Sequence, residues 1–494
     1  MSQQPVELVF VPLPRLSHLI STVDAAKLLL TRGGNRLAIT ILIIKLPDAG
    51  DDHKEKVSSI MEKTIPRLRF IELPDHDCNI EPGTPTYFFR YTDSHADKIR
   101  QVLSDLVEKP LIPRSKLAGL VVDMFCTSFI QVGDEFNIPS YVFVTTGALT
   151  LGTFYDLISL KFEQNQDLTQ YKDSDVELSF HCASQPIPVK LFTSPLFDGS
   201  PIGDLLFGYL RKFAAAKGVL INTFYELQTY AIDSLSADYS MYPKVYPIGP
   251  ILMDDHDDSV RNPSADDLMK WLDDQPEDSV VFLCFGTMGA FQGAQVREFA
   301  KALEDSGSRF VWSLRKPSEE KSIPLAGAGE YGSFEEVLPE GFLERTAAVG
   351  RVIGWAPQVA VLAHAAVGGF VSHCGWNSVL ETVWYGVPVA ALPLYAEQHL
   401  NAFNLVRELG IAEAIRIDYK IDFGRREKAA AEMEVVPAGE IEAAIRRVMA
   451  ADGAARKKMK EMQRKSREVS KEGGSSYASQ MEFLRDVLRN VGLE

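Results

Sequence analysis

Residues 355–398, WAPQVAVLAHAAVGGFVSHCGWNSVLETVWYGVPVAALPLYAEQ, contain the strongest local signal in the chain. The apolar run VGGFVS (367–372) predicts a buried strand that ends at His373. A glycine-containing turn follows, and we expect a helix to start near Asn377 or Ser378. A strand, a tight turn and a helix N-terminus in this order present free backbone N–H groups and a positive dipole end to an anion.

The same helix start has a simpler interpretation. Ser378 with Glu381 three residues later fits a capping box, in which side chains satisfy the first backbone donors of a helix without any ligand. Polar residues at the ends of the neighbouring strands, beside two tryptophans, favour a binding site instead; these residues are His373, Glu397 and Gln398.

Short apolar runs separated by helical patterns continue on both sides of this segment. Such alternation predicts βαβ units and parallel sheets. We therefore expect an α/β fold of two doubly wound, Rossmann-like domains that face each other across a cleft, with ligands at the carboxyl ends of the strands. The runs are 7–13, 37–44, 68–73, 117–123, 141–146, 218–224, 244–250, 279–285, 309–315, 350–354, 367–372, 387–393 and 411–417.

A break in this pattern predicts the domain boundary. The segment 251–266, ILMDDHDDSVRNPSAD, is acidic, contains proline and lacks hydrophobic periodicity, as a linker does. We expect an N-terminal domain over 1–250, a C-terminal domain over 267–475, and a final helix over 476–494 that packs back on the N-terminal domain. The polar stretch from about 163 to 204 predicts a long loop region.

Composition excludes several classes of function. A chain of 494 residues with 46% hydrophobic and 24% charged residues is long enough for two globular domains. The formal net charge of −16 disfavours nucleic-acid binding. We find no secretory signal and no apolar stretch long enough to cross a membrane. Because the five cysteines are scattered and odd in number, we expect reduced thiols in a cytoplasmic monomer.

Two other patterns suggest ligands but have simpler explanations. Gly327, Gly329 and Gly332 match the GxGxxG spacing, yet they do not follow a strand directly, so we interpret them as part of a loop. The run from Asp254 to Asp258, which includes His256, contains metal-binding residue types. We interpret it as solvated linker charge and predict no metal site.

Residues 355–398 resemble the donor-binding signature of plant secondary-product UDP-glycosyltransferases, inverting enzymes of glycosyltransferase family 1 with the GT-B architecture of two Rossmann-like domains. The resemblance covers nearly the whole chain and includes KWLDDQPEDSVVFLCFGTMG (270–289), LPEGF (338–342) and LNAF (400–403). It implies transfer of glucose from UDP-glucose to a small apolar or phenolic acceptor, such as a flavonoid, to give a β-glucoside. It also implies that no cofactor and no metal are needed.

The resemblance assigns donor-binding roles to individual residues. Trp355 is expected to stack on the uracil, and the backbone of Ala356 to bind the base edge. The ribose is assigned to Gln358 and Glu381. The diphosphate is assigned to Thr287, His373, Asn377 and Ser378, and the hexose to the backbone of Trp376 and the side chains of Glu397 and Gln398. Family members usually have serine at the place of Thr287, and glutamine at the place of Gln398 goes with glucose.

The resemblance also places the general base at His18, which follows the first predicted strand and precedes a helix expected near Ser21. Neutral imidazole can accept a proton near neutral pH. Asp123 ends the apolar run 117–123, where a carboxylate is costly unless a partner compensates its burial. In the family this aspartate orients the histidine; Asp123 could also cap the segment that starts at Phe125.

The expected acceptor pocket is lined by Phe125, Thr145, Thr146 and the 163–204 segment. Arg15 and Ser17 stand where the family has glycine. We predict that these larger residues narrow the entrance and that the Arg15 cation disfavours protonation of the neighbouring base. The alternative is that Arg15 points to solvent and pairs with a surface acid.

Three other functions fit parts of the pattern. One is another GT-B enzyme that epimerises or hydrolyses the nucleotide sugar, and the second is a catalytically silent UDP-sugar-binding protein. The pair His18 and Asp123 disfavours the silent protein, which would need neither residue. The third is a dehydrogenase, which the lack of a well-placed glycine fingerprint disfavours.

Overall fold

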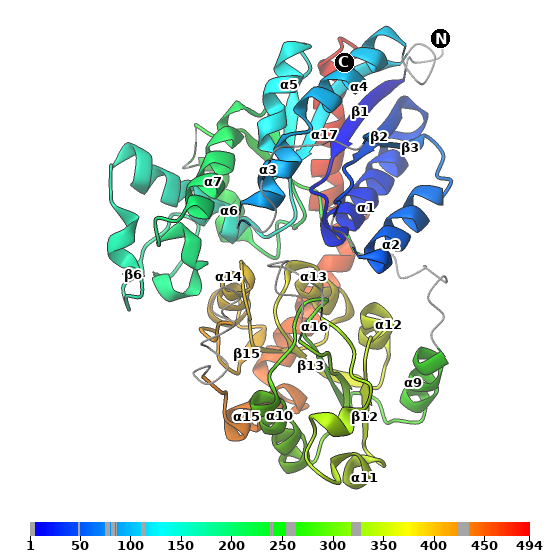
Figure 1. Cartoon of the computed structure of the whole chain (residues 1–494), viewed down its shortest axis with the longest axis vertical. Coiled ribbons are helices and arrows are strands. Elements are labelled where there is room, and N and C mark those ends of the chain that lie inside the picture. Colours follow the sequence, from blue (N-terminus) through cyan, green and yellow to red (C-terminus); the bar gives the residue numbers. More distant parts are fainter. Residues whose placement is uncertain are drawn as a thin grey trace.

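The computed structural model describes residues 5–47, 50–74, 80, 84, 86–109, 115–237, 239, 241–252, 263–317, 328–421 and 434–494. Most of the predicted linker, the run from Asp254 to Asp258, Gly327 and Cys78 lie outside the described residues. Two α/β domains are stacked along the long axis, each with helices on both faces of a parallel sheet (Figure 1). The predicted fold class is confirmed.

The N-terminal domain is built on a seven-stranded parallel sheet in the order β3-β2-β1-β4-β5-β8-β9. The strands are β1 (Val6–Val11), β2 (Leu37–Ile43), β3 (Leu68–Glu72), β4 (Lys116–Asp123), β5 (Ser140–Val144), β8 (Gly218–Ile221) and β9 (Lys244–Pro247). Both faces of β1 and β2 are buried, as their uninterrupted apolar sequences predict. The main helices are α1 (Leu16–Gly33), α2 (Asp51–Glu62), α3 (Tyr87–Asp93), α4 (Ala96–Glu108), α5 (Ile130–Glu135), α6 (Ala148–Ile158), α7 (Pro201–Arg211) and α8 (Thr229–Ala237).

The C-terminal domain repeats this design with a six-stranded parallel sheet in the order β12-β11-β10-β13-β14-β15. Its strands are β10 (Val280–Cys284), β11 (Arg309–Ser313), β12 (Gly350–Ile353), β13 (Val367–Ser372), β14 (Val389–Ala391) and β15 (Ala412–Ala414). Its helices are α9 (Pro263–Asp273), α10 (Gly293–Ser306), α11 (Phe342–Thr346), α12 (Gln358–Ala363), α13 (Trp376–Tyr385), α14 (Gln398–Phe403), α15 (Ala438–Met449) and α16 (Ala454–Glu468).

The strand order reverses once in each sheet, between β1 and β4 and between β10 and β13. Ligands of open α/β sheets bind at such switch points, outside the carboxyl ends of the strands. His18 follows β1, and Asp123 is the last residue of β4; these are the two strands at the first switch point. Thr287 and His373 follow the two strands at the second. The topology therefore places both groups of predicted site residues where ligands bind.

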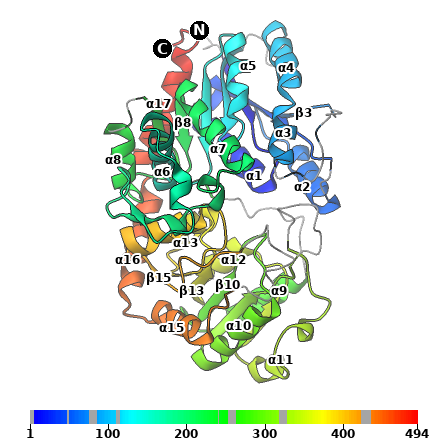
Figure 2. The same ribbon diagram turned by 60° about the vertical axis from the view of Figure 1, so that its left-hand side comes forward.

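The last helix, α17 (Ser475–Arg489), crosses back and runs beside the first sheet, as both views show (Figures 1 and 2). Phe483 is fully buried there, with its ring centroid 5.1 Å from that of Tyr141 and 5.6 Å from that of Tyr246. Beyond α17, the side-chain amide of Asn490 donates to the carbonyl of Ala118 at 2.7 Å. These contacts tie the end of the chain to the N-terminal domain.

The start of α1 differs from its prediction. The helix begins at Leu16, five residues before Ser21, so His18 lies in the first helical turn and not in a preceding loop. The N-cap is Arg15, with φ −123° and ψ 135°, and the chain before it turns tightly, because the Arg15 N–H donates to the carbonyl of Leu13 at 2.7 Å. The five residues before Ser21, Leu16 to Ile20, were not included in the predicted helix.

The predicted capping box on α13 is wrong. The helix begins at Trp376, its N-cap is Gly375, and no side chain caps it. The Ser378 hydroxyl accepts a hydrogen bond from Gln358 instead. Because the N-cap is a glycine, α13 has no N-cap side chain to bind its first backbone N–H groups.

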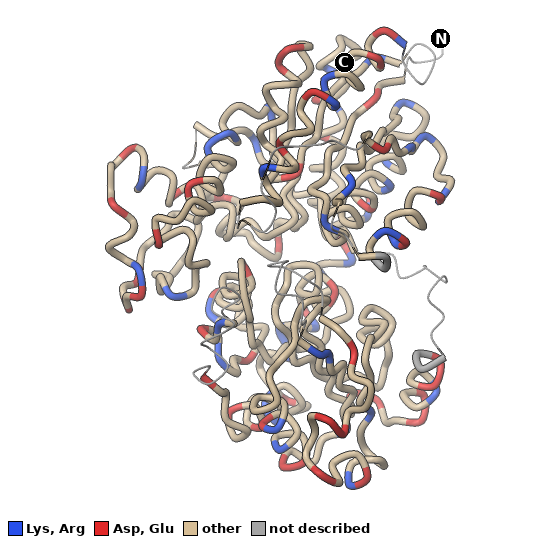
Figure 3. The backbone as a smooth tube through the Cα atoms, in the orientation of Figure 1, with Lys and Arg blue, Asp and Glu red and all other residues tan. Residues whose placement is uncertain are grey.

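The polar stretch 163–204 is rich in loops, as predicted, and contains short 3₁₀ turns and the two-residue strands β6 (Glu177–Leu178) and β7 (Ile187–Pro188). Acidic and basic residues are interspersed over both domains (Figure 3). Within the described ranges, no helix combines the length and apolar character that crossing a bilayer requires.

We predict that Phe483→Ala lowers the free energy of unfolding by about 3 to 5 kcal/mol, because it leaves a cavity between α17 and the first sheet. Urea denaturation would measure the change. Arg485→Ala, an exposed position on the same helix, is the matched control and should stay within about 0.5 kcal/mol of the wild type. Equal stability of the two variants would show that α17 does not stabilise the N-terminal domain.

Candidate active site

A histidine and an aspartate form a hydrogen-bonded pair at the first switch point. Nδ1 of His18 lies 2.7 Å from Oδ2 of Asp123. The Asp123 side chain is fully buried, whereas the His18 side chain is 19% exposed. The second carboxylate oxygen of Asp123 accepts from the backbone N–H of Phe125 at 3.0 Å. Asp123 holds the imidazole by Nδ1 and accepts a hydrogen bond from the turn after β4, but it is not a helix N-cap, because the following 3₁₀ helix (Thr127–Phe129) has Cys126 as its N-cap.

Electrostatics adjust the basicity of His18. Burial alone lowers the pKa of an imidazole, but the charge and hydrogen bond of Asp123, with a further contribution from Glu397, outweigh burial and raise the pKa of His18 above 6.5. The Arg15 cation acts in the opposite direction, as predicted, but does not dominate. Because Nδ1 is engaged by Asp123, Nε2 is the nitrogen that remains for chemistry.

Half-buried aromatic side chains extend away from His18. The ring centroid of Phe125 lies 6.2 Å from that of His18, and the ring of Phe89 lies 5.8 Å from Phe125. Phe88 is 5.4 Å from Phe89, and the Arg15 guanidinium carbon lies 4.6 Å from the centre of the Phe88 ring. We call Arg15, Phe88, Phe89 and Phe125 the aromatic wall.

Sequence analysis missed Phe88 and Phe89. Three consecutive aromatic residues, Tyr87 to Phe89, start α3 and were the only local sign of a ligand-contacting surface. Aromatic side chains on a short helix more often belong to a core, so this sign was not specific. The Arg15 guanidinium packs on Phe88, and the two interpretations of Arg15 stay predictions.

The two predicted threonines lie on the other side of the base. The Thr145 hydroxyl is 3.5 Å from Nδ1 of His18. Thr146 is buried, and its hydroxyl has no hydrogen-bond partner in the described part of the chain. Both follow β5 and precede α6, so they also belong to the carboxyl end of the first sheet.

The second switch point holds a second histidine in a different environment. A Cβ built on Gly286 would lie 2.6 Å from Nε2 of His373, and one on Gly375 would lie 2.5 Å from it, so the two glycines form a slot for the ring. Burial lowers the pKa of His373 to about 4, which keeps the ring neutral near pH 7. Its buried Nδ1 atom has no protein partner among the described residues. An unpartnered buried nitrogen beside the start of α13 is well placed to contact a ligand.

The start of α13 also joins the two domains. The indole N–H of Trp376 donates to the carbonyl of Asn222 in the N-terminal domain at 2.6 Å. Its ring packs so closely on Gly147 that an added Cβ would lie 2.8 Å from it. The neighbouring Asn377 side chain lies 3.4 Å from the hydroxyl of Ser21, one turn after His18 on α1. The base and the start of α13 are thus held close together.

A polar group lies one turn further along α13. The amide of Gln358 donates to the Ser378 hydroxyl at 2.8 Å and to the Glu381 carboxylate at 2.6 Å. Glu381 is buried, so its charge depends on such partners. A carboxylate in this place can accept hydrogen bonds from the hydroxyls of a sugar ring.

An exposed aromatic ring follows. Trp355 is 40% exposed, which is unusual for a residue of its size and leaves one surface to stack on a planar ligand. The Nζ atom of Lys56 lies 5.3 Å and the Cζ atom of Arg315 lies 5.4 Å from its ring centre. Ala356 is buried directly after it, and Thr287 is exposed after β10.

The remaining predicted residues start α14. The Gln398 side-chain oxygen accepts from the backbone N–H groups of Leu394 at 3.0 Å and Tyr395 at 3.1 Å, which fixes the amide with its NH₂ group as the donor. Burial raises the pKa of Glu397, although its interaction with His18 acts in the opposite direction.

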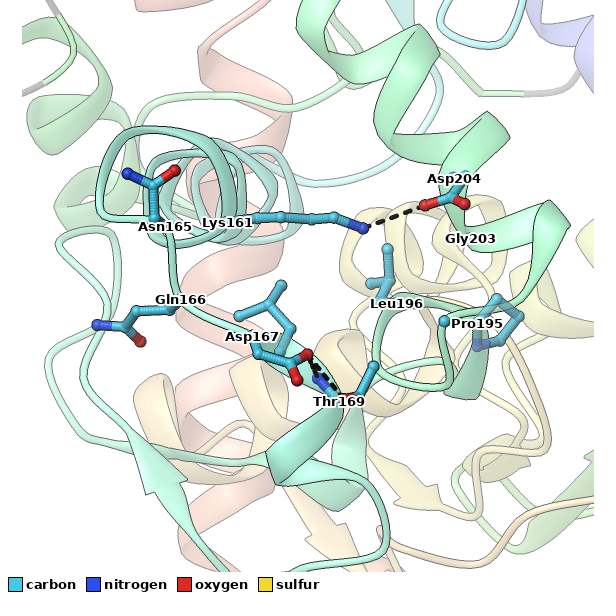
Figure 4. Close-up of a pocket in the computed structure, with 11 residues that line it drawn as sticks. Lys161, Asn165, Gln166, Asp167, Thr169, Pro195, Leu196, Gly203 and Asp204 are labelled. Carbon is cyan, nitrogen blue, oxygen red and sulfur yellow. Dashed lines mark hydrogen bonds and ion pairs between the residues drawn. The ribbon is translucent and has the colours of Figure 1, made fainter.

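The 163–204 segment borders a separate cavity. This cavity has a volume of about 270 Å³ and lies between Lys161 and Asp204, whose ion pair of 3.2 Å spans it (Figure 4). The same segment touches the C-terminal domain, where Lys190 pairs with Asp418 at 2.9 Å. Its expected place beside the acceptor stays a prediction.

Among the residues that the structure describes, no group of three or more histidine, cysteine, aspartate or glutamate side chains is arranged to hold a metal ion. The four described cysteines, Cys126, Cys182, Cys284 and Cys374, are buried and free. The polar groups of the candidate site are backbone N–H groups, two imidazoles, side-chain amides and hydroxyls, and carboxylates.

Comparisons with known proteins agree on one family. A family model described as UDP-glucoronosyl and UDP-glucosyl transferase matches residues 228–418. The chain is 44% identical over 489 residues to UDP-glucose flavonoid 3-O-glucosyltransferase 6 of Fragaria ananassa, an alignment that covers 97% of this chain and 98% of that protein.

Solved structures give the same result. A transferase from Siraitia grosvenorii in complex with UDP matches with a TM-score of 0.86 and 40% identity, and the match covers 98% of this chain and 100% of that one. A glycosyltransferase from Medicago truncatula complexed with UDP-glucose matches with a TM-score of 0.82 and 35% identity, over 98% of each chain.

We predict that Asp123→Asn lowers the pKa of His18, because burial is then no longer outweighed by a carboxylate. An NMR titration of the histidine resonances would measure it. Asp156→Asn is the control, because that carboxylate pairs with His181 at 2.7 Å and should leave the His18 titration unchanged. An unchanged pKa of His18 in Asp123→Asn would show that the pair does not control the base.

Proposed function

The chain belongs to the UDP-glycosyltransferase family, and on that basis we propose that it transfers glucose from UDP-glucose to a hydroxyl group of a small aromatic acceptor, with His18 as general base. The observation that carries this proposal is the short contact of His18 with the buried Asp123, directly across the domain interface from the start of α13.

The geometry of the C-terminal domain supports a nucleotide-sugar donor. Trp355 offers an exposed ring for the uracil, a stack worth about 1 to 3 kcal/mol. Glu381 with Gln358 suits the ribose hydroxyls, as carboxylates do in other Rossmann-like folds. The uncapped start of α13 and the unpartnered nitrogen of His373 suit the diphosphate. Gln398 and Glu397 lie at the interface, where the hexose would be.

The proposed reaction is a single displacement. Nε2 of His18 takes the proton of the acceptor hydroxyl while the oxygen forms a bond to the anomeric carbon of glucose. The bond between that carbon and the diphosphate oxygen breaks, and its electron pair leaves with UDP. Asp123 stabilises the imidazolium, as the acid of a hydrolase triad does. One displacement inverts the α-linked donor to a β-glucoside.

Charge on the departing UDP would be stabilised by protein groups. The backbone N–H groups at the start of α13, with Asn377, Ser378 and Thr287, are preorganised donors near the site of the developing charge. Because His373 is neutral near pH 7, it would act as a hydrogen-bond donor and not as a cation. We therefore propose that the transfer needs neither a metal nor a cofactor.

The acceptor is proposed to be a flavonoid or another phenol. The Fragaria ananassa relative is named a flavonoid 3-O-glucosyltransferase, and the aromatic wall beside His18 offers half-buried rings to a planar molecule. A nucleotide-sugar epimerase or hydrolase would need no aromatic wall beside the base, so we place transfer ahead of both.

We predict that the protein converts UDP-glucose and at least one of a panel of phenols to a product heavier by one hexose, measured by mass spectrometry. NMR coupling at the anomeric proton should show a β-linkage, and excess EDTA should not reduce the rate. Release of free glucose alone would indicate a hydrolase. An α-linked product would refute a single displacement, and a loss with EDTA that only a divalent cation restores would refute metal independence.

His18→Ala should lower kcat by about 10²- to 10⁴-fold, the usual contribution of a general base, while the affinity for UDP stays unchanged. Steady-state kinetics and calorimetric titration with UDP would measure the two effects. His364→Ala serves as the control, because that imidazole pairs with Asp273 away from the interface and should retain activity. A parallel loss of UDP affinity in His18→Ala would assign His18 a structural role.

A further inference from the structure

We infer that Arg15 binds an anionic group of the acceptor, so that the enzyme favours phenols that carry a carboxylate over their neutral analogues. This inference rests on the proposed function and names the chemical class of its acceptor. It comes from the position of Arg15, from the three phenylalanines of the aromatic wall that link Arg15 to His18, and from the charge of the half-buried Arg15 guanidinium.

The backbone fixes Arg15 relative to the base. Its N–H donates to the carbonyl of Leu13 at 2.7 Å, and its own carbonyl accepts from Leu19 at 2.9 Å. Arg15 is the N-cap of α1 and lies three residues before His18. Positions three apart on a helix are neighbours on one face, with Cβ atoms about 5 to 6 Å apart. Both side chains therefore start from the same side of α1.

The aromatic wall connects the two side chains through α3 and the turn after β4. From Arg15 the contacts pass through Phe88, Phe89 and Phe125 to His18, with successive separations of 4.6, 5.4, 5.8 and 6.2 Å. Each of these side chains is only half-buried, so each keeps surface that a ligand can cover. A planar acceptor lying on this wall would have the base at one end and a cation at the other.

The charge of Arg15 is maintained although its surroundings are partly apolar. Burial lowers the pKa of Arg15 to about 10, so the side chain is still a cation near pH 7. The guanidinium carbon lies 4.6 Å from the centre of the Phe88 ring, and the N–H groups of a guanidinium are paired donors that suit a carboxylate. A partly desolvated cation gains more from an anionic ligand than one in bulk water.

Stacking on phenylalanine does not by itself make a binding site. Arg211, at the end of α7, packs in the same way on Phe162 of the π-helical turn Ser159–Glu163, with its guanidinium carbon 4.5 Å from the ring centre. Among the described residues, no ring contact links that pair to His18. What distinguishes Arg15 is its place on the same face as the base. Arg211 is therefore a matched control for the loss of a stacked arginine.

The test compares kcat/KM for 4-hydroxycinnamate and 4-hydroxybenzoate with kcat/KM for their methyl esters, with saturating UDP-glucose. The wild type should favour each acid over its ester. Arg15→Gln should lower kcat/KM for the acids about 10- to 100-fold, the range expected for a lost hydrogen bond to a charged group, and change the esters by less than about threefold. Arg15→Lys should retain part of the preference, and Arg211→Gln should retain all of it.

Three results would overturn the inference. One is a wild type that prefers the esters, and another is an acid-to-ester ratio that is the same in Arg15→Gln as in the wild type. The third is a product that mild alkali cleaves, because it would show glucose on the carboxylate and hence the carboxylate at His18. Transfer to the esters with any of these results leaves the proposed function intact, whereas absence of transfer to every phenol would contradict both.

Discussion

The arrangement of the site depends on one buried hydrogen bond, from the indole N–H of Trp376 to the carbonyl of Asn222 at 2.6 Å. Trp376 is the first residue of α13, and Asn222 follows β8 in the other domain. Asn222 also binds both backbone groups of Ile251 through its side chain, at 2.8 and 3.2 Å. Asn222 thus contacts both Ile251, where the chain leaves the N-terminal domain, and α13, the helix that is proposed to bind the diphosphate. A shift at this contact would separate His18 from the donor.

Further contacts reinforce this alignment on the side of the 163–204 segment. Ser184 donates to Glu408 at 2.7 Å, Lys420 donates to the carbonyl of Phe192 at 2.8 Å, and Lys190 pairs with Asp418. These contacts are polar and partly exposed, so each contributes little alone. Leu400 and Phe403 on α14 add apolar contacts, because they pack in the core of the N-terminal domain. The domain interface therefore has a buried centre, which contains the Trp376 hydrogen bond and the apolar contacts of α14. Its edge is held by polar contacts that each contribute little.

The two histidines of the candidate site lie in surroundings that shift their pKa values in opposite directions, which fits the two different functions proposed for them. His18 gains the Asp123 carboxylate, which raises its pKa and stabilises the protonated form that a general base must pass through. His373 has no acid beside it and lies in a slot between two glycines, so burial lowers its pKa to about 4. The first can accept a proton, and the second remains a neutral donor. Opposite shifts of this kind are typical of sites that divide proton transfer from charge stabilisation.

The sequence by itself determined the strands and the fold class, and it supplied the candidate site residues whose roles are proposed above. Apolar runs bounded by turns mark buried parallel strands, and the 355–398 segment is dense enough in unusual residues to be recognised. It also indicated that Asp123 needs a partner, because a carboxylate at the end of a buried strand is costly without one.

Only the tertiary structure decided where the helices begin and what lies beside the base. α1 begins at Leu16 and α13 at Trp376, in both cases earlier than the sequence predicted. The pairing of Ser378 with Gln358 instead of a capping box depends on α12 packing beside α13. Phe88 was not predicted because its contact with Arg15 joins elements far apart in the chain. Contacts of this kind arise from packing, and local sequence patterns do not encode them.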